Sequence, residues 1–216
     1  NDIVTIGSDD DGLDNVYGTV NSDGGVGGTD KIVVQDGGSS YTGDRSQEAT
    51  SRILKGILKE DAGYSEFETV ELKLTQGRSD LTVSSTLPGS LTNIYTGNGS
   101  DKITVQTTQG DLKVNSGGDR DIIVVDNTEG NLVLESEDGN DDITIVTVQG
   151  NLRIDSGTGD EKIDVTKVEG DLEIKSGGGR DIIDVTRVTG NSNVTSGGGG
   201  DTITIVFVEG DLEVDS

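Results

Sequence analysis

The chain has 216 residues, 34 of them glycine, with 29% hydrophobic residues and a formal net charge of −25. The acidic excess excludes nucleic acid as an expected partner, because phosphate binding needs clustered Lys and Arg, and it disfavours an anionic membrane surface. The chain contains no Cys, which excludes disulfides, and no apolar run reaches the roughly 20 residues of a membrane span. Because many carboxylates on one molecule repel one another unless cations lie among them, the charge alone favours a divalent metal.

Residues 1–40 predict two irregular N-terminal turns. The phrases that begin at Asp2 and at Asp30 match the strand phrase that begins at Asp121 in the later part of the chain. A long loop rich in Gly and Asp separates the two phrases. Residues 25–34 combine a glycine-rich run with Asp30 and the second phrase, as the later corners do.

Residues 41–63 differ from the rest of the chain and predict a helical insertion. Between 44 and 63 the apolar residues recur at helical spacing, and the segment carries a potential capping pair and a glycine stop. We expect one amphipathic helix of about three turns, packed on the side of the stack or over an open end. A helix that binds a partner is the alternative. The residues that carry this pattern are Asp44, Gln47, Ala49, Ile53, Leu54, Ile57, Leu58 and Gly63.

Residues 64–95 predict a return to irregular β-turns. The stretch from Phe67 to Leu74 alternates at period two, as a half-buried strand does. The phrases at Asp80 and Leu91 are imperfect copies of the two later strand phrases, and Pro88 lies in the loop between them.

From residue 96 to residue 216 the chain repeats every twenty residues. Each unit predicts two short strands, one with an Ile-x-Val pair and one with a Leu-x-Ile or Leu-x-Val pair, separated by turns. The aligned columns are Gly110, Gly130, Gly150, Gly170, Gly190 and Gly210; Leu112, Leu132, Leu152, Leu172, Ser192 and Leu212; Ser116, Ser136, Ser156, Ser176, Ser196 and Ser216; and Ile103, Ile123, Ile143, Ile163, Ile183 and Ile203.

These columns predict one all-β domain over residues 1–216. We expect a parallel β-helix or β-roll solenoid of about eight turns of about twenty residues, in which each turn buries its apolar side against its neighbours. The chain opens within a strand-like phrase and ends on a repeat serine. We therefore expect a fragment of a longer protein, whose neighbouring repeats pack on its ends.

The corner that precedes each Ile-x-Val strand carries the chemistry. Each corner is glycine-rich and ends in an acidic residue, as in Ser176-Gly-Gly-Gly-Arg-Asp181. Glycine frees the backbone to turn its carbonyls toward the corner, and the acid supplies a hard oxygen. Stacked turns bring successive carboxylates to within about 5 Å, a spacing that a bridging Ca²⁺ relieves.

These corners resemble the G-G-x-G-x-D-x-U-x nonapeptide of the RTX (haemolysin-type) calcium-binding repeats, and residues 96–105 are the cleanest copy. Residues 64–83 are also similar to units of very large secreted bacterial repeat proteins. The resemblance implies a secreted β-roll that folds around Ca²⁺ held between turns by Asp side chains and glycine-loop carbonyls. The implied ligand residues are Asp30, Asp101, Asp121, Asp141, Glu161, Asp181, Asp201, Gly97, Gly99, Gly177, Gly179, Gly197 and Gly199.

The chain departs from the family pattern in ways that keep a metal-free corner open. It has one corner motif per twenty residues, where RTX rolls have one at each corner of an eighteen-residue turn. Ser or Thr replaces the first Gly, and Glu replaces Asp at 161. Arg120 and Arg180 stand beside Asp121 and Asp181, which they could neutralise without metal.

The remaining polar columns predict structural hydrogen bonds. The Asp or Asn residues that follow Gly110 to Gly210 are expected to bond the neighbouring backbone or one another along a ladder. The Ser column is expected to complete inward turns by bonding the backbone.

The sequence favours a non-enzymatic, calcium-stabilised repeat segment of a large secreted or cell-surface protein, such as an adhesin, a stalk or a matrix component. Extracellular glycans and matrix components are candidate partners beside calcium. The alternatives are a metal-independent module that binds carbohydrate or another surface, and a polysaccharide-active β-helix enzyme. The chain has no His and no Cys, and its acidic residues recur in columns where catalysis needs a unique constellation.

Overall fold

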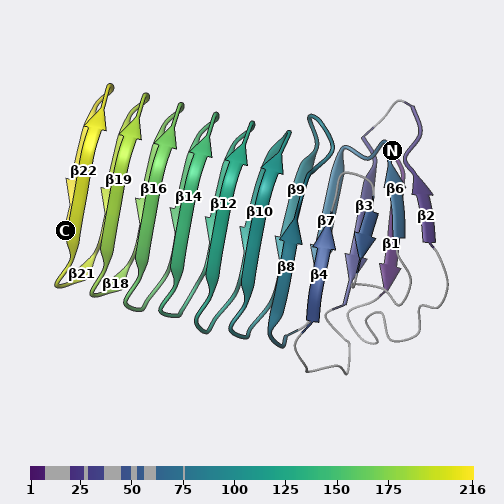
Figure 1. Cartoon of the computed structure of the whole chain (residues 1–216), viewed down its shortest axis with the longest axis horizontal. Helices are drawn as coiled ribbons and strands as arrows, with labels where there is room; N and C mark the ends of the chain where they lie inside the picture. The colour runs from purple at the N-terminus through teal and green to yellow at the C-terminus, as the bar shows by residue number, and fades with distance from the viewer. Residues whose placement is uncertain (8–19, 27–28, 37–44, 50–52, 56–61, 75) are drawn as a thin grey trace.

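The computed structural model describes residues 1–7, 20–26, 29–36, 45–49, 53–55, 62–74 and 76–216, and all regular structure in them is β. The strands stack side by side into a rod of about seven turns, with the N-terminus at one end and the C-terminus at the other (Figure 1). The prediction of an all-β parallel solenoid is confirmed, with about seven turns in place of about eight. Within the described ranges no helix is long and apolar enough to span a membrane.

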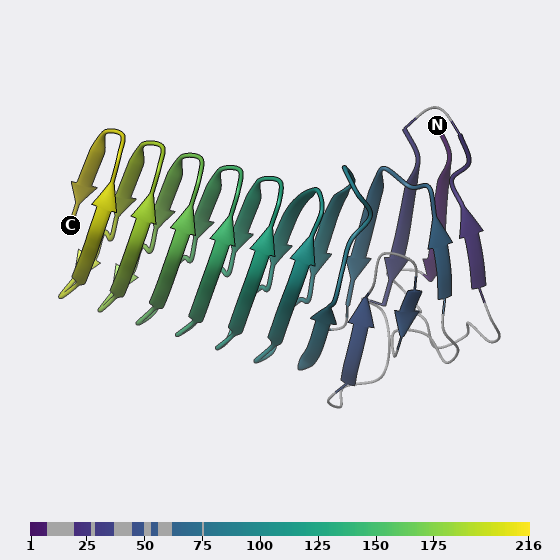
Figure 2. The ribbon, with the colours of Figure 1, turned by 45° about the horizontal axis from the view of Figure 1, so that its top comes forward.

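Each regular turn contains one long and one short strand, which lie in two facing layers (Figure 2). The long strands are β10 (Lys102–Thr108), β12 (Ile122–Thr128), β14 (Asp142–Val148), β16 (Lys162–Val168), β19 (Ile182–Val188) and β22 (Thr202–Val208). The short strands are β11 (Asp111–Asn115), β13 (Leu132–Glu135), β15 (Leu152–Asp155), β17 (Leu172–Lys175), β20 (Ser192–Thr195) and β23 (Leu212–Asp215).

Pairing between successive turns keeps the twenty-residue register predicted from the columns. Ile103 pairs with Ile123, and Leu112 pairs with Leu132, in parallel. The long strands belong to an 11-stranded sheet and the short strands to a 10-stranded sheet. A third sheet of two strands, β18 (Gly178–Gly179) and β21 (Gly198–Gly199), lies at the corner between them.

The N-terminal strands extend both sheets. The 10-stranded sheet continues through β9 (Leu91–Tyr95), β7 (Thr69–Lys73), β3 (Lys31–Gln35) and β1 (Ile3–Gly7), all parallel. The 11-stranded sheet continues through β8 (Ser79–Val83), β4 (Arg45–Ala49), β5 (Ile53–Lys55), β6 (Ala62–Ser65) and β2 (Val20–Asp23).

The predicted helix within residues 41–63 is wrong for the part of this segment that the structure describes. Strand β4 pairs parallel with β8, and β5 pairs antiparallel with both β4 and β6. The helical spacing of the apolar residues did not decide the structure, because an isolated helix of this length has marginal stability. The edge of β8 instead offers unpaired backbone N–H and C=O groups, with which a strand can form hydrogen bonds. Residues 41–44, 50–52 and 56–61 lie outside the described residues.

The core is a narrow space between the two sheets, filled by stacked columns of apolar side chains. Ile123 and Val125 of the long strand and Leu132 and Leu134 of the short strand are fully buried, as the sequence predicts. A third inward column was not predicted, because it follows Val125 by three residues and breaks the alternation of the strand. Its members are Thr108, Thr128, Val148, Val168 and Val188.

Candidate metal-binding corner

A column of acidic side chains runs along the inside of one corner of the solenoid. Each acid immediately precedes a long strand, at the corner that carries β18 and β21 (Figure 1). The first five members are at most 2% exposed, and the sixth, in the last turn, is half-buried. We call this set the carboxyl column: Asp101, Asp121, Asp141, Glu161, Asp181 and Asp201.

The carboxyl column is held by hydrogen bonds between turns. The backbone N–H of Asp101 donates to Oδ1 of Asp121 at 2.8 Å, and that of Asp121 donates to Oδ1 of Asp141 at 2.8 Å. The same bond joins Asp181 to Asp201 at 3.0 Å. Each of these carboxylates therefore caps the backbone of the turn before it, so one of its two oxygens is already committed.

The second carboxylate oxygen faces the Ser column. In one turn Ser176 donates its hydroxyl to Oδ2 of Asp181 at 2.5 Å. Ser116 lies close enough to Asp121 to lower the pKa of that carboxyl, but without hydrogen-bond geometry, and Oδ2 of Asp121 is buried with no partner. The same holds for Asp141 beside Ser136 and for Asp101 beside Thr96: each hydroxyl lies close enough to lower the pKa of the carboxyl, but Oδ2 is buried and has no partner in hydrogen-bond geometry.

Burial dominates the proton affinity of these groups. It raises the pKa of Asp101 to about 6 and that of Asp121 to about 8, and it also raises the pKa of Asp141. The half-buried Asp201 behaves in the opposite way, because the backbone N–H of Asp181 lowers its pKa. A buried carboxyl in the middle of this column therefore needs a proton or a cation to offset the cost of its charge.

Glu161 interrupts the ladder. Its N–H donates to Oδ1 of Asp181 at 3.0 Å, as in the other turns, but both oxygens of its own carboxyl are buried and without a hydrogen-bond partner. Burial and the adjacent Asp181 carboxyl raise the pKa of Glu161 to about 9. The side chain is one methylene longer than Asp, which carries its carboxyl away from the backbone N–H of the turn before it.

Two positions shape each corner; the first is glycine in every regular turn except that of Asp121, where it is Asp119 at φ 78°. Gly159, Gly179 and Gly199 have φ of 153°, 153° and 154°, and a Cβ at any of them would overlap the carbonyl oxygen of the residue twenty positions earlier. Only glycine satisfies both conditions. The other position, two residues earlier, holds Gly177 in one turn but Glu137, at φ 60°, in another.

Asp30 does not belong to the carboxyl column. It precedes β3 in the 10-stranded sheet, where the register aligns it with Glu68 and, further along, with Ser90 and Gly110. Its N–H donates to Oε2 of Glu68 at 2.6 Å. Asp30 is therefore at the opposite corner of the coil, although its local sequence matches that of the candidate ligands.

The two arginines do not form ion pairs with the acids beside them in sequence. Arg120 and Arg180 are exposed, whereas Asp121 and Asp181 are buried, and no ion pair in the described part of the chain joins them. Arg120 instead lowers the pKa of Asp141 in the next turn. Neutralisation by the neighbouring arginine therefore does not account for the buried column.

The opposite corner carries the predicted Asp and Asn ladder. Oδ1 of Asp111 accepts the backbone N–H of Asn131 at 2.8 Å, and Oδ1 of Asn131 accepts that of Asn151 at 2.9 Å. The pattern continues through Asp171, Asn191 and Asp211. Only an acceptor oxygen is required, which explains why both Asn and Asp occur in this column.

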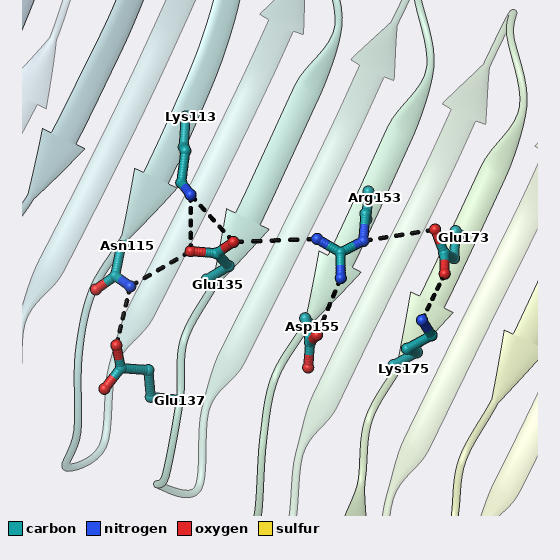
Figure 3. A network of polar contacts seen from close by, with 8 residues as sticks. All are labelled: Lys113, Asn115, Glu135, Glu137, Arg153, Asp155, Glu173 and Lys175. Carbon is teal, nitrogen blue, oxygen red and sulfur yellow. Dashed lines mark hydrogen bonds and ion pairs between the residues drawn. The ribbon is translucent and has the colours of Figure 1, made fainter.

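The outer face of the 10-stranded sheet balances its own charges (Figure 3). Lys113 pairs with Glu135 at 3.0 Å, and Arg153 reaches both Asp155 at 3.2 Å and Glu173 at 3.5 Å. Exposed pairs of this kind contribute at most about 1 kcal/mol each. Because these carboxylates already have cationic partners, the interior column remains the better candidate for a cation.

The oxygen ligands of the carboxyl column suit a hard cation, but the number of acidic side chains that meet at one point limits the coordination they can supply. The unpartnered oxygens of Asp101, Asp121, Asp141 and Glu161 are the ligand type that Ca²⁺ prefers. Among the described residues, however, no three acidic side chains converge on one point. The column therefore fits Ca²⁺ only if backbone carbonyls of the glycine loops complete the coordination.

Comparison of the chain with protein-family models, with curated proteins and with solved structures found no match. The RTX resemblance therefore rests on the corner motif alone, and calcium binding stays a prediction.

Proposed function

We propose that the chain is a non-enzymatic, calcium-stabilised rod within a larger secreted or cell-surface protein. The observation that carries the proposal is the carboxyl column, in which successive turns place buried carboxyls with unpartnered oxygens directly above one another. Stacking at about 4.8 Å per turn makes these charges repel unless they are neutralised. A row of cations is a neutralising partner that the repeat itself could specify.

The residues that would hold calcium are the acids of the column, together with carbonyls of the glycine corners. Bound calcium would supply the positive charge that the buried carboxylates lack. Because the unfolded chain has no such row, calcium would stabilise the folded form increasingly as its concentration rises above the dissociation constant. Calcium sites of extracellular modules have dissociation constants of about 10⁻⁴–10⁻³ M, so a site of this kind would fill at the calcium concentrations found outside the cell.

The outer faces support a carbohydrate-binding role less well. Two adjoining depressions, of about 310 and 440 Å³, run beside the Asn and Asp ladder. Their lining includes Arg153, Glu173 and Asn193, and no lining residue is aromatic. Sugar rings would therefore find hydrogen bonds there but no stacking surface. Binding to glycans remains the alternative function.

Thermal unfolding followed by circular dichroism tests the proposal, first in EDTA and then in millimolar Ca²⁺ at matched ionic strength. We expect Ca²⁺ to raise the melting temperature by several degrees, and Mg²⁺ to raise it less because Mg²⁺ demands a tighter octahedral shell. An unchanged melting temperature would overturn the calcium proposal and leave the solenoid fold intact.

A matched pair of variants locates the effect. Asp121→Asn keeps the shape of a buried column residue but removes its charge, so the calcium response should shrink while the metal-free protein becomes more stable. Asp126→Asn changes an exposed acid further along the same turn and should leave the response unchanged. Equal responses of the two variants would place the calcium elsewhere.

A further inference from the structure

The carboxyl column is not uniform, and its one irregular member is Glu161. At every other step from Ser79 to Asp201, the backbone N–H of one turn donates to the carboxylate of the next. Among the described residues, only the step from Asp141 to Glu161 lacks this bond. Both Glu161 oxygens are left unpartnered, although the residue is only 2% exposed.

The longer side chain brings the Glu161 carboxyl to a different set of oxygens. Oε1 lies 2.5 Å from the point where a Gly159 Cβ would be, and the carbonyl oxygen of Gly139 lies against the same point. In two regular turns the Asp oxygen stays further from the matching point, at 3.0 Å from that of Gly139 and 3.2 Å from that of Gly199. The Glu161 carboxylate oxygen therefore lies closer to this glycine corner than the Asp oxygen does in those two turns, and the carbonyl oxygen of Gly139 lies at the same corner.

Asp181 supplies a second carboxylate at this place. Its Oδ1 accepts the N–H of Glu161 and its Oδ2 accepts the hydroxyl of Ser176, so its orientation is fixed. The Asp181 carboxyl adjoins that of Glu161 and is one of the causes of the raised pKa of Glu161. Two adjoining buried carboxyls, one of them without any donor, need either a shared proton or a cation to offset their charge.

We propose that Glu161 and Asp181, with the carbonyl oxygen of Gly139, form a distinct cation site inside the column, and that this site takes Ca²⁺ before the rest of the row. The inference rests on the proposed function, since it assigns the order in which the column fills. In the regular turns a backbone N–H already donates to one carboxylate oxygen of each Asp, and this bond offsets part of the negative charge that a metal would otherwise neutralise. At Glu161 no donor competes with the cation.

The test is isothermal titration of the whole chain with Ca²⁺, starting from the EDTA-treated and desalted protein. The wild-type chain should show a first binding event that is tighter than the rest. Glu161→Gln keeps the length of the side chain but removes its charge, and it should weaken the first event at least tenfold while the weaker events persist. An unchanged first event in Glu161→Gln would overturn the proposal.

A gain-of-site variant keeps the proposal falsifiable if Glu161→Gln folds poorly. Asp101→Glu puts the longer acid beside Gly99, where backbone of the preceding turn also lies against the missing Cβ. It should interrupt the ladder a second time and add a second tight event. An Asp101→Glu titration identical to that of the wild type would overturn the proposal.

Two outcomes separate this proposal from the one on which it rests. If the wild-type chain binds Ca²⁺ in events of equal affinity, the row of calcium sites is supported and the distinct site at Glu161 is overturned. If the wild-type chain shows no heat and no thermal shift with millimolar Ca²⁺, calcium binding itself fails. A pair of carboxyls that instead shares a proton would give identical Ca²⁺ titrations for wild type and Glu161→Gln, which also overturns the distinct site.

Discussion

The regular stack from Asp101 onward and the region before it are built from the same kinds of strand but differ in how those strands are connected. In the regular stack every turn contributes one strand to each sheet, so like residues form continuous columns. Before Asp101 the 10-stranded sheet continues without interruption, whereas the other sheet contains β5, which runs antiparallel to its neighbours β4 and β6. The two sheets of a solenoid can thus diverge independently.

This difference shows that a column needs register as well as composition. Asp30 has the same local sequence as the column acids, yet it lies at the opposite corner because its strand joined the other sheet. Among the residues that the structure describes, the carboxyl column therefore belongs to the regular stack. Each prediction below either breaks that regularity or measures what it contributes.

The largest effect is expected from a side chain placed in the tight glycine position. Gly179→Ala should destabilise the chain by about 3 kcal/mol or more, because φ is 153° and the new Cβ would overlap the carbonyl oxygen of Gly159. Gly178→Ala is the control, since a Cβ there meets nothing closer than the carbonyl oxygen of Gly198 at 3.8 Å. Chemical denaturation of both variants decides the matter, and equal stabilities would show that the corner can relax.

A second effect concerns pH in the metal-free protein. The raised pKa values of Asp121 (to about 8) and Glu161 (to about 9) mean that the folded chain binds these protons more tightly than the unfolded chain. The resulting stabilisation is fully present below the ordinary carboxyl pKa of about 4 and is lost as the pH rises through 8 to 9. The melting temperature in EDTA should therefore fall steadily toward alkaline pH.

Calcium provides the control for this pH dependence. Because Ca²⁺ and protons compete for the same oxygens, saturating Ca²⁺ should flatten the decline. A metal-free melting temperature that rises over the same range would contradict the raised pKa values.

A smaller gain is expected from the third inward column. Thr128 is fully buried and its hydroxyl has no partner, whereas the next three turns carry Val at the same position. Thr128→Val should stabilise the chain by about 1 kcal/mol, because it removes an unsatisfied buried hydroxyl without changing the volume much. Thr166→Val, at an exposed position, should change the free energy of unfolding by less than about 0.5 kcal/mol.

The smallest effect tests backbone strain at the corner. Glu137 occupies the left-handed conformation that Gly157 and Gly177 adopt in the next two turns. Glu137→Gly should stabilise the chain by less than about 1 kcal/mol, because relief of strain is partly offset by the greater freedom of glycine in the unfolded state. The same change at Glu66, with φ 58° in the irregular region, should give a gain of similar size. A loss in both variants would show that the strain is negligible.

The repeat makes the fold readable from the sequence. The column from Ile103 to Ile183 and the Leu column from Leu112 to Leu172 define the stacking register by their spacing alone, and both are buried as expected. The strands described between Arg45 and Ser65 could not be predicted, because the helical spacing was overruled by pairing of β4 with β8 and of β5 with β4 and β6.

The candidate site was partly predictable in the same sense. The acids from Asp101 to Asp201 could be aligned because they recur every twenty residues. Asp30 does not fall on this repeat, and its place in the fold was predicted wrongly. The sequence marked Glu161 as a departure from the motif. It could not show that the extra methylene removes a hydrogen bond, since that depends on the distance between neighbouring turns.

The ladder at the opposite corner has a consequence for chemical ageing. Hydrolysis of an asparagine side-chain amide releases ammonia and leaves aspartate. Here Asn151 and Asn191 contribute Oδ1 to the backbone of the following turn, and that oxygen remains after the conversion. Asp111 and Asp171 already perform the same task with a carboxylate. A rod joined in this way should keep its turns together as its asparagines age.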